Sequence, residues 1–298
     1  MVRPLGISTN GGTNVASRTS PTVRRRRLAS EMRRLRKESG RTREEAARFA
    51  DIAPATVSRI EAAVHAPKVA DIMALCKFYG LDDDRTDVLV TLARQSRQRG
   101  WWQKYGDAIP AWFEVYVGLE EEVSEIRSYQ AEVIFGLLQT EAYARAVMLA
   151  DDNVSPDDGE RMLEVRMRRQ KVLEGSDRPR LWIIQNEAAL RREVGGHSVM
   201  CEQLTHLAAL SQIPGVTIQV LPLASGAHPS MHGAFEILGF PDRRDPDVVY
   251  VDYRKGCIYL EESSEVDDYA QLFDQLRARA LGPDETRALI ARLADQKA

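Results

Sequence analysis

Apolar residues in the first third of the chain recur at the spacing of a helix. Leu28, Met32 and Leu35 stand at positions i, i+4 and i+7, and the neighbouring basic residues lie largely off this stripe. The pattern predicts a helix that opens near Arg24 and closes at Gly40, a residue type that favours helix ends. Four further helices are predicted at about residues 42–50, 54–62, 69–79 and 82–99. The first third is therefore expected to be an all-α domain of five helices.

Local signals define the second and third of these helices. Thr42 and Glu45 have the spacing of a capping box, in which the hydroxyl accepts from the Glu45 amide and the carboxylate reaches back. Pro54 is tolerated in the first turn of the next helix. Asp51 stands between the two helices and adopts left-handed geometry better than most residues other than glycine. We therefore expect two short helices that are joined by a tight turn.

The pattern becomes mixed beyond residue 100. Short segments rich in apolar, β-branched or aromatic residues, bounded by Pro, Gly or Asp, predict strands. These strands span residues 181–185, 216–221, 234–240, 248–252 and 257–260, and the last two are expected to pair as a hairpin. Helices are predicted at residues 111–127, 140–149, 156–173, 187–191, 199–211, 264–280 and 283–294. An α+β domain is therefore expected to follow the helical one.

Domain boundaries follow from these changes of pattern. Residues 1–23 lack apolar periodicity and are rich in Gly, Asn, Ser and Thr, which predicts a disordered leader. A helical domain over residues 24–99 and a second domain over residues 100–298 are expected to follow. The chain has neither a secretory signal pattern nor the roughly 20 consecutive apolar residues of a membrane span. A cytoplasmic protein without a membrane partner is therefore expected.

Charge is distributed unevenly between these parts. The whole chain of 298 residues has a formal net charge of -3. Through residue 82 it has 16 Lys and Arg against 8 Asp and Glu, and the remainder has 25 against 36. This division indicates that the first part meets a polyanion. The arginine run of residues 24–27 is either an arm that binds phosphate or enters a minor groove, or the solvated start of a helix.

Candidate catalytic groups are few. Pro229 lies between His228 and His232 and argues against a continuous helix that presents both to a metal. Ser225 lies near His228, but no nucleophile-elbow motif, P-loop or dinucleotide fingerprint is present. We therefore expect no enzyme activity, no metal and no cofactor, with a catalytic C-terminal domain as a weaker alternative. Buried, reduced thiols are expected for Cys76, Cys201 and Cys257.

Residues 42–61 read TREEAARFADIAPATVSRIE and resemble the helix-turn-helix of the Xre family of repressors. Small or apolar residues stand where two helices must cross closely, and polar residues project from the second helix. Such a helix fits the major groove, which is about 12 Å wide, and Arg59 is the best candidate to bond guanine O6 and N7. The resemblance implies groove-facing roles for Pro54, Ala55, Thr56, Ser58 and Arg59, and phosphate contacts for Thr42 and Arg43.

Further motifs look like the C-terminal domain of actinobacterial Xre-type regulators, WhiJ-like and antitoxin-like members among them. These motifs are RGWW at 99–102, YGD at 105–107, GLLQTEAYARA at 136–146, SGAHP at 225–229 and DVVYV at 247–251. The resemblance implies a lambda-repressor-like DNA-binding domain and a C-terminal domain that senses a small protein encoded nearby or a small-molecule effector. A homodimer on double-stranded DNA is expected, because one recognition helix reads few base pairs. The alternative is an antitoxin-like protein-interaction module with secondary autoregulatory DNA binding.

An aromatic-rich stretch follows the domain junction. Trp101, Trp102 and Tyr105, together with His228, are the candidate ligand or partner site of the second domain. The alternative for the aromatic residues is core packing between the domains. For His228 the alternative is a structural role, in which it fixes its loop by hydrogen bonds.

Overall fold

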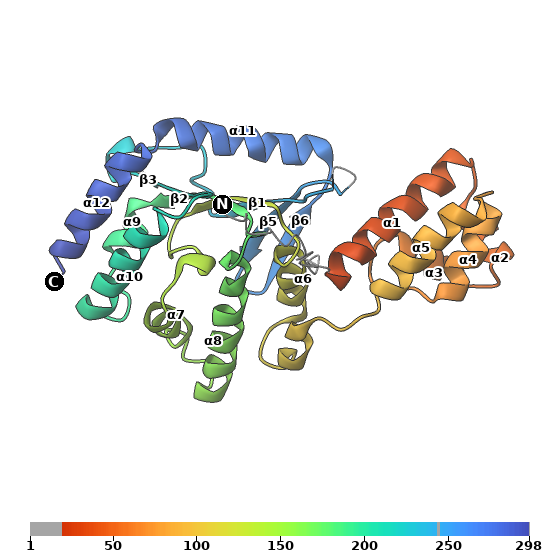
Figure 1. Ribbon diagram of the computed structural model, residues 1–298, viewed down its shortest axis with the longest axis horizontal. Helices are drawn as coiled ribbons and strands as arrows, with labels where there is room; N and C mark the ends of the chain where they lie inside the picture. The colour runs from red at the N-terminus through yellow and green to blue at the C-terminus, as the bar shows by residue number, and fades with distance from the viewer. Residues whose placement is uncertain (1–19, 243–244, 298) are drawn as a thin grey trace, which may run out of the picture.

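The computed structural model describes residues 20–242 and 245–297. A helical N-terminal domain is followed by a C-terminal domain in which helices pack on both faces of a six-stranded sheet (Figure 1). The predicted combination of an all-α domain and an α+β domain is therefore confirmed.

Five helices form the N-terminal domain around one apolar core. The stripe of Leu28, Met32 and Leu35 lies in this core, together with Val57 and Ile60 from the third helix. The burial of these side chains explains why the helices assemble, because each helix is amphipathic and short. The helices are α1 (Pro21–Glu38), α2 (Arg43–Phe49), α3 (Pro54–Glu61), α4 (Val69–Phe78) and α5 (Asp83–Gln95).

The predicted capping box and tight turn are both present. Thr42 Oγ1 accepts from the Glu45 amide at 3.1 Å, and Glu45 Oε2 accepts from the Thr42 amide at 2.9 Å. Asp51 has the left-handed conformation that the turn between α2 and α3 requires, with φ of +53°. These local interactions fix the angle at which α3 leaves α2.

The C-terminal domain is built on a mixed sheet with the strand order β3-β2-β1-β4-β5-β6. The first three strands pair in parallel, and the remaining neighbours pair antiparallel. The predicted hairpin of the last two strands is confirmed, with Tyr253 opposite Gly256. The strands are β1 (Glu125–Gln130), β2 (Arg180–Asn186), β3 (Val216–Leu221), β4 (Phe235–Gly239), β5 (Val248–Tyr253) and β6 (Gly256–Leu260).

The central strand β1 corrects the sequence prediction. The helix expected over residues 111–127 ends at Glu120 as α6 (Ala111–Glu120), and β1 begins five residues later. Its sequence, EIRSYQ, is mostly polar, although Ser128 and Gln130 are buried. Both polar side chains find hydrogen-bond partners inside the fold, with Ser128 Oγ donating to the Phe235 carbonyl at 3.1 Å. Tertiary pairing therefore stabilises a strand that has few apolar residues of its own.

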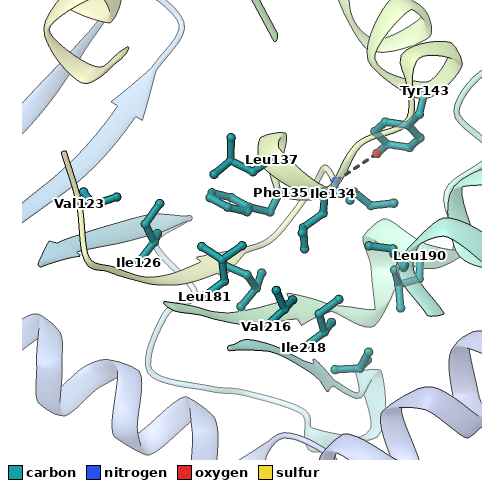
Figure 2. Packing of buried hydrophobic residues seen from close by; sticks show 14 of the residues in the cluster. Val123, Ile126, Ile134, Phe135, Leu137, Tyr143, Leu181, Leu190, Val216 and Ile218 are labelled. Atoms are coloured by element: carbon teal, nitrogen blue, oxygen red, sulfur yellow. Dashed lines mark hydrogen bonds between the residues drawn. The ribbon is translucent and has the colours of Figure 1, made fainter. Parts of the chain in front are cut away.

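Side chains alternate between the two faces of the sheet. Ile126, Ile183 and Ile218 point to the larger core, part of which Figure 2 shows with the Tyr143 hydroxyl accepting from the Ile134 amide at 3.1 Å. One helix, α11 (Ser263–Arg279), covers the opposite face (Figure 1). The other helices of this domain, besides α6, are α7 (Glu141–Met148), α8 (Pro156–Gln170), α9 (Glu187–Arg191), α10 (His197–Leu210) and α12 (Pro283–Asp295).

The first helix α1 belongs to both domains. Its N-terminal end lies beside α6 (Figure 1), where Val23 is 3% exposed and joins the core of the C-terminal domain. Ser20 and Thr22 are also buried, and the Ser20 hydroxyl caps the helix by accepting from the Thr22 amide. The prediction of a disordered leader is therefore wrong for residues 20–23, whose burial in the other domain no local pattern announces. Residues 1–19 of the predicted leader lie outside the described residues.

The arginine run of residues 24–27 is neither a free arm nor a solvated helix start. Arg24 pairs with Glu122 at 3.2 Å, Arg26 with Glu261 at 3.2 Å, and Arg27 with Asp242 at 2.9 Å. All three carboxylates belong to the C-terminal domain. These arginines therefore join the two domains, and both sequence interpretations of the run are corrected.

We expect Gly118→Ala to loosen this junction. A Cβ atom at Gly118 would lie 2.2 Å from Thr22 Oγ1, so either α1 or α6 must move. Overpacking of this kind costs about 1 to 3 kcal/mol. Hydrogen exchange of the amides in residues 20–27 should become faster, while Gly282→Ala, whose Cβ meets only Glu285 Oε2 at 3.6 Å, should leave it unchanged. Unaltered exchange in Gly118→Ala would show that the close approach does not hold α1.

Candidate nucleic-acid interface

Helix α3 presents the predicted groove-facing residues to solvent. Its inner side packs Val57 and Ile60 in the helical core, with 1% and 2% exposure. Its outer side carries four exposed residues and the half-buried Thr56. The exposed residues are Pro54, Ala55, Ser58 and Arg59. The structure therefore gathers all five on one accessible side of a short helix.

Arg59 lies along α3 in the free protein. Its Nε donates to the Ala55 carbonyl at 3.2 Å, and its Nη2 donates to Thr56 Oγ1 at 3.3 Å. Both bonds are exposed and lie within the same helix. A base edge that offers two acceptors can therefore replace them without disturbing the core.

Glu61 at the end of α3 is a buried hub of ion pairs, which the sequence reasoning missed. Its carboxylate is 2% exposed and accepts from Arg36 Nε at 2.5 Å and from Arg43 Nε at 2.9 Å. Arg33 also donates to the Glu61 carbonyl at 2.5 Å. Glu61 therefore ties α3 to both α1 and α2. Its arginine partners lie 18 to 28 positions earlier in the chain, so no local sequence pattern indicated this role.

The two predicted phosphate contacts also have structural partners. Arg43 uses its Nε for Glu61, but its side chain is 45% exposed. Thr42 is exposed, although its hydroxyl accepts the capping bond from Glu45. Both residues thus lie on the surface at the N-terminal end of α2, and their contact with phosphate stays a prediction.

A basic groove of about 590 Å³ runs beside α3. Thr56 and Arg59 line one side of it. His65 and Lys68 from the loop before α4, and Arg97 beyond α5, also line it. The sequence did not indicate these three residues, because only the fold brings the loop before α4 and the segment beyond α5 next to α3. Asp71 is the one acidic residue of this lining, so the groove is basic overall.

The four candidate residues of the C-terminal domain do not form one site. Trp102 and Tyr105 are 3% and 7% exposed and pack with Val117 and Val165, which favours the core-packing interpretation for both. Trp101 is half-buried and borders a cavity. His228 lies on the face of the sheet that α11 covers. Its Nε2 is 3.3 Å from the hydroxyl of Tyr129, whose side chain belongs to the apolar core between the sheet and α11. A ligand or partner role for Trp101 stays a prediction.

A buried polar network joins α6, α8 and β4. Arg169 donates to both carboxylate oxygens of Glu120, at 2.7 and 2.8 Å. The Tyr116 hydroxyl lies 2.9 Å from Glu120 Oε1 and 2.6 Å from Glu236 Oε2. Burial raises the pKa of Glu236 to about 8, and the nearby Glu120 contributes. The sequence did not indicate this network, because its members are dispersed over more than one hundred positions.

The three cysteines are free thiols, with Cys76 buried and Cys201 and Cys257 half-buried. Burial raises the pKa of Cys76 to about 11. Within the described part of the chain, no three His, Cys, Asp or Glu side chains are grouped to hold a metal ion. No helix within residues 20–242 or 245–297 is both long and apolar enough to cross a membrane.

Residues 27–89, which include the exposed α3, match the family described as "Helix-turn-helix domain", and this match supports a DNA-binding regulator. Residues 113–292 match the family described as "Domain of unknown function (DUF5753)". This second match covers more than half of the chain, which therefore belongs to the DUF5753 family. No curated protein and no solved structure is significantly similar to it.

Glu61→Ala should destabilise the helical domain strongly. Its removal deprives Arg36 and Arg43, whose side chains are 14% and 45% exposed, of their shared carboxylate, and the loss of a hydrogen bond to a charged group costs about 1.5 to 3 kcal/mol. Glu38→Ala is the control, because Glu38 pairs with Arg34 at the surface and should cost less than about 1 kcal/mol. Denaturant unfolding of both variants measures the difference. Equal losses would mean that the hub contributes no more than a surface pair.

Glu236 should make the stability of the fold depend on pH. Because burial raises its pKa from 4.5 to about 8, the folded state retains a proton that the unfolded state releases. This contribution is complete below the unfolded pKa and is lost as the pH rises through the folded pKa. Glu236→Gln should therefore flatten the decline in melting temperature between pH 4.5 and about pH 8, whereas Glu174→Gln, at an exposed position, should not. Identical pH profiles for all three proteins would contradict this assignment.

Proposed function

We propose that the protein is a sequence-specific transcriptional regulator of the actinobacterial Xre type. It binds an operator as a homodimer with α3 in the major groove. Its C-terminal domain senses a small-molecule effector or a small partner protein. The proposal assigns no catalytic role and no cofactor to that domain.

The exposed side of α3 is the observation that carries this proposal. Thr56, Ser58 and Arg59 offer hydrogen-bonding groups next to the small surfaces of Pro54 and Ala55. A helix with such a face can approach base edges closely, and Arg59 can pair with guanine. The groove with Lys68 and Arg97 supplies positive charge for the phosphates beside it.

An antitoxin-like interaction module is the second candidate, and one observation favours it. Strand β6 is an edge of the sheet, and the hairpin exposes Ile258 and Tyr253 to 51% and 60%. Edge strands with exposed apolar side chains are common sites of pairing with another chain. In that case DNA binding would serve autoregulation. A small protein that co-purifies stoichiometrically and is lost on Ile258→Lys would favour this candidate.

Two substitutions should separate base reading from phosphate binding. Arg59→Ala should cost about 1 to 3 kcal/mol on an operator selected from random duplexes, and should relax preference at one base pair in each half-site. Lys68→Ala should weaken operator and scrambled DNA alike and should reduce the salt slope by about one unit. Titrations of both duplexes at several salt concentrations measure both effects.

Two outcomes would contradict these roles. If Arg59→Ala loses affinity equally for operator and scrambled DNA, Arg59 only positions the protein on the backbone. If it binds both duplexes normally, α3 is not the recognition helix.

A further inference from the structure

A small cavity of about 250 Å³ lies where the domain junction meets α6 and α8. Trp101 and Val117 supply apolar surface to it, and Glu120, Arg168, Arg169 and Lys171 supply charge. One of its lining residues, Trp101, follows the last helix of the N-terminal domain, α5, by only a few residues. The proposed regulator needs an effector site, and this cavity has the composition of one.

The floor of the cavity is electrostatically satisfied. Glu120 and Arg169 form a bidentate ion pair, and their side chains are 2% and 4% exposed. The guanidinium of Arg169 also lies 5.0 Å from the ring centroid of Tyr116. This ion pair therefore offers no net charge to a ligand. The other charged residues of the lining determine whether the cavity binds an anion or a cation.

The wall is an indole ring that is held in place at one edge. Trp101 Nε1 donates to Glu121 Oε2 at 2.8 Å, which fixes the orientation of the ring. The face of the ring is covered by the guanidinium of Arg168, which lies 4.5 Å from the ring centroid. Arg168 is exposed and forms no ion pair with a carboxylate in the described part of the chain. Its side chain can therefore move aside, or can stack on a ligand that takes its place.

The lining carries three basic residues and two acidic ones. Glu120 and Arg169 neutralise each other, and the formal charge of Glu121, whose partner Trp101 is neutral, is outweighed by Arg168 and Lys171. The lining therefore has a formal net charge of +1. A flat ring stacks on an indole, and a carboxylate pairs with a guanidinium and an ammonium. From this geometry we infer that the cavity binds a small planar aromatic carboxylate. This inference deepens the proposed function and rests on it.

Helix α6 links this cavity to the DNA-binding domain. Val117 and Glu120 of α6 face the cavity, whereas Gly118 of the same helix contacts Thr22 of α1. Glu122, just beyond α6, pairs with Arg24. A ligand that moves Trp101 or the end of α6 therefore acts on α1, which packs against α3 in the core of the N-terminal domain. Occupancy of the cavity changes operator affinity by this route.

The test uses the full-length protein and 2-naphthoate as the probe, titrated by calorimetry. Neutral 2-naphthalenemethanol and non-planar cyclohexanecarboxylate separate the need for charge from the need for a flat ring. Arg168→Gln removes the charge above Trp101, and Trp101→Leu removes the ring. Arg277→Gln is the matched control, because Arg277 covers Trp182 at 4.8 Å but belongs to α11 on the other face of the sheet.

We expect saturable binding of 2-naphthoate by the wild type, and weaker binding of both other probes. Arg168→Gln should weaken it about tenfold, the usual scale for loss of one charge-assisted contact. Trp101→Leu should abolish it, and Arg277→Gln should leave it unchanged. Absence of saturable binding to the wild type, or an equal effect of Arg277→Gln and Arg168→Gln, would overturn the assignment.

Operator binding is measured separately, with and without 2-naphthoate. Protein that binds operator but not the probe refutes the cavity assignment and leaves the proposed regulator intact. Protein that binds the probe at Trp101 but binds no DNA refutes the proposed function alone. A change of operator affinity that Arg168→Gln removes supports both.

Discussion

The burial of the first turn of α1 in the C-terminal domain is the contact on which the arrangement of the whole chain depends. Val23 packs in one core, and Leu28 and Met32 of the same helix pack in the other. An α-helix has no flexible joint within a few residues, so the two cores are held by a rigid element. The ion pairs of Arg24, Arg26 and Arg27 with carboxylates of the C-terminal domain surround this anchor. Partly buried pairs of this kind specify an orientation even where they add little stability.

A second constraint holds α6, the helix against which α1 is anchored. Tyr116 and Glu120 of α6 belong to the network that includes Arg169 and Glu236. A buried network whose members satisfy one another tolerates few alternative arrangements, because any displacement leaves a polar group unpaired. Helix α6 is thus fixed to the sheet on one side and supports α1 on the other. Changes at the buried network therefore reach α1 through α6.

Local patterns predicted the turns and helix ends that local interactions stabilise, and also the strands that are mostly apolar. The capping box of Thr42, the left-handed Asp51 and the apolar strands needed no knowledge of distant residues. Strand β1 could not be predicted, because its polar residues are satisfied only by partners across the sheet. The arginine run of residues 24–27 failed for a similar reason, since its carboxylate partners lie about one hundred to more than two hundred positions away. At the interface, the sequence indicated the exposed face of α3 but not the role of Glu61 or the groove residues His65, Lys68 and Arg97.

Glu61 attaches α3 firmly to the rest of the fold, and this attachment bears on the spacing between the two half-sites of an operator. Because Glu61 binds Arg36 of α1, helices α3 and α1 move as one piece, and α1 in turn follows the C-terminal domain. In the homodimer that we propose, two such chains related by a two-fold axis would hold their α3 helices at a distance that the whole fold sets. Half-sites on DNA are separated by about 34 to 36 Å per helical turn, so such a dimer would select operators by spacing as well as by sequence. In such a dimer the C-terminal domain would set the spacing between the half-sites, and α3 would read the bases within each of them.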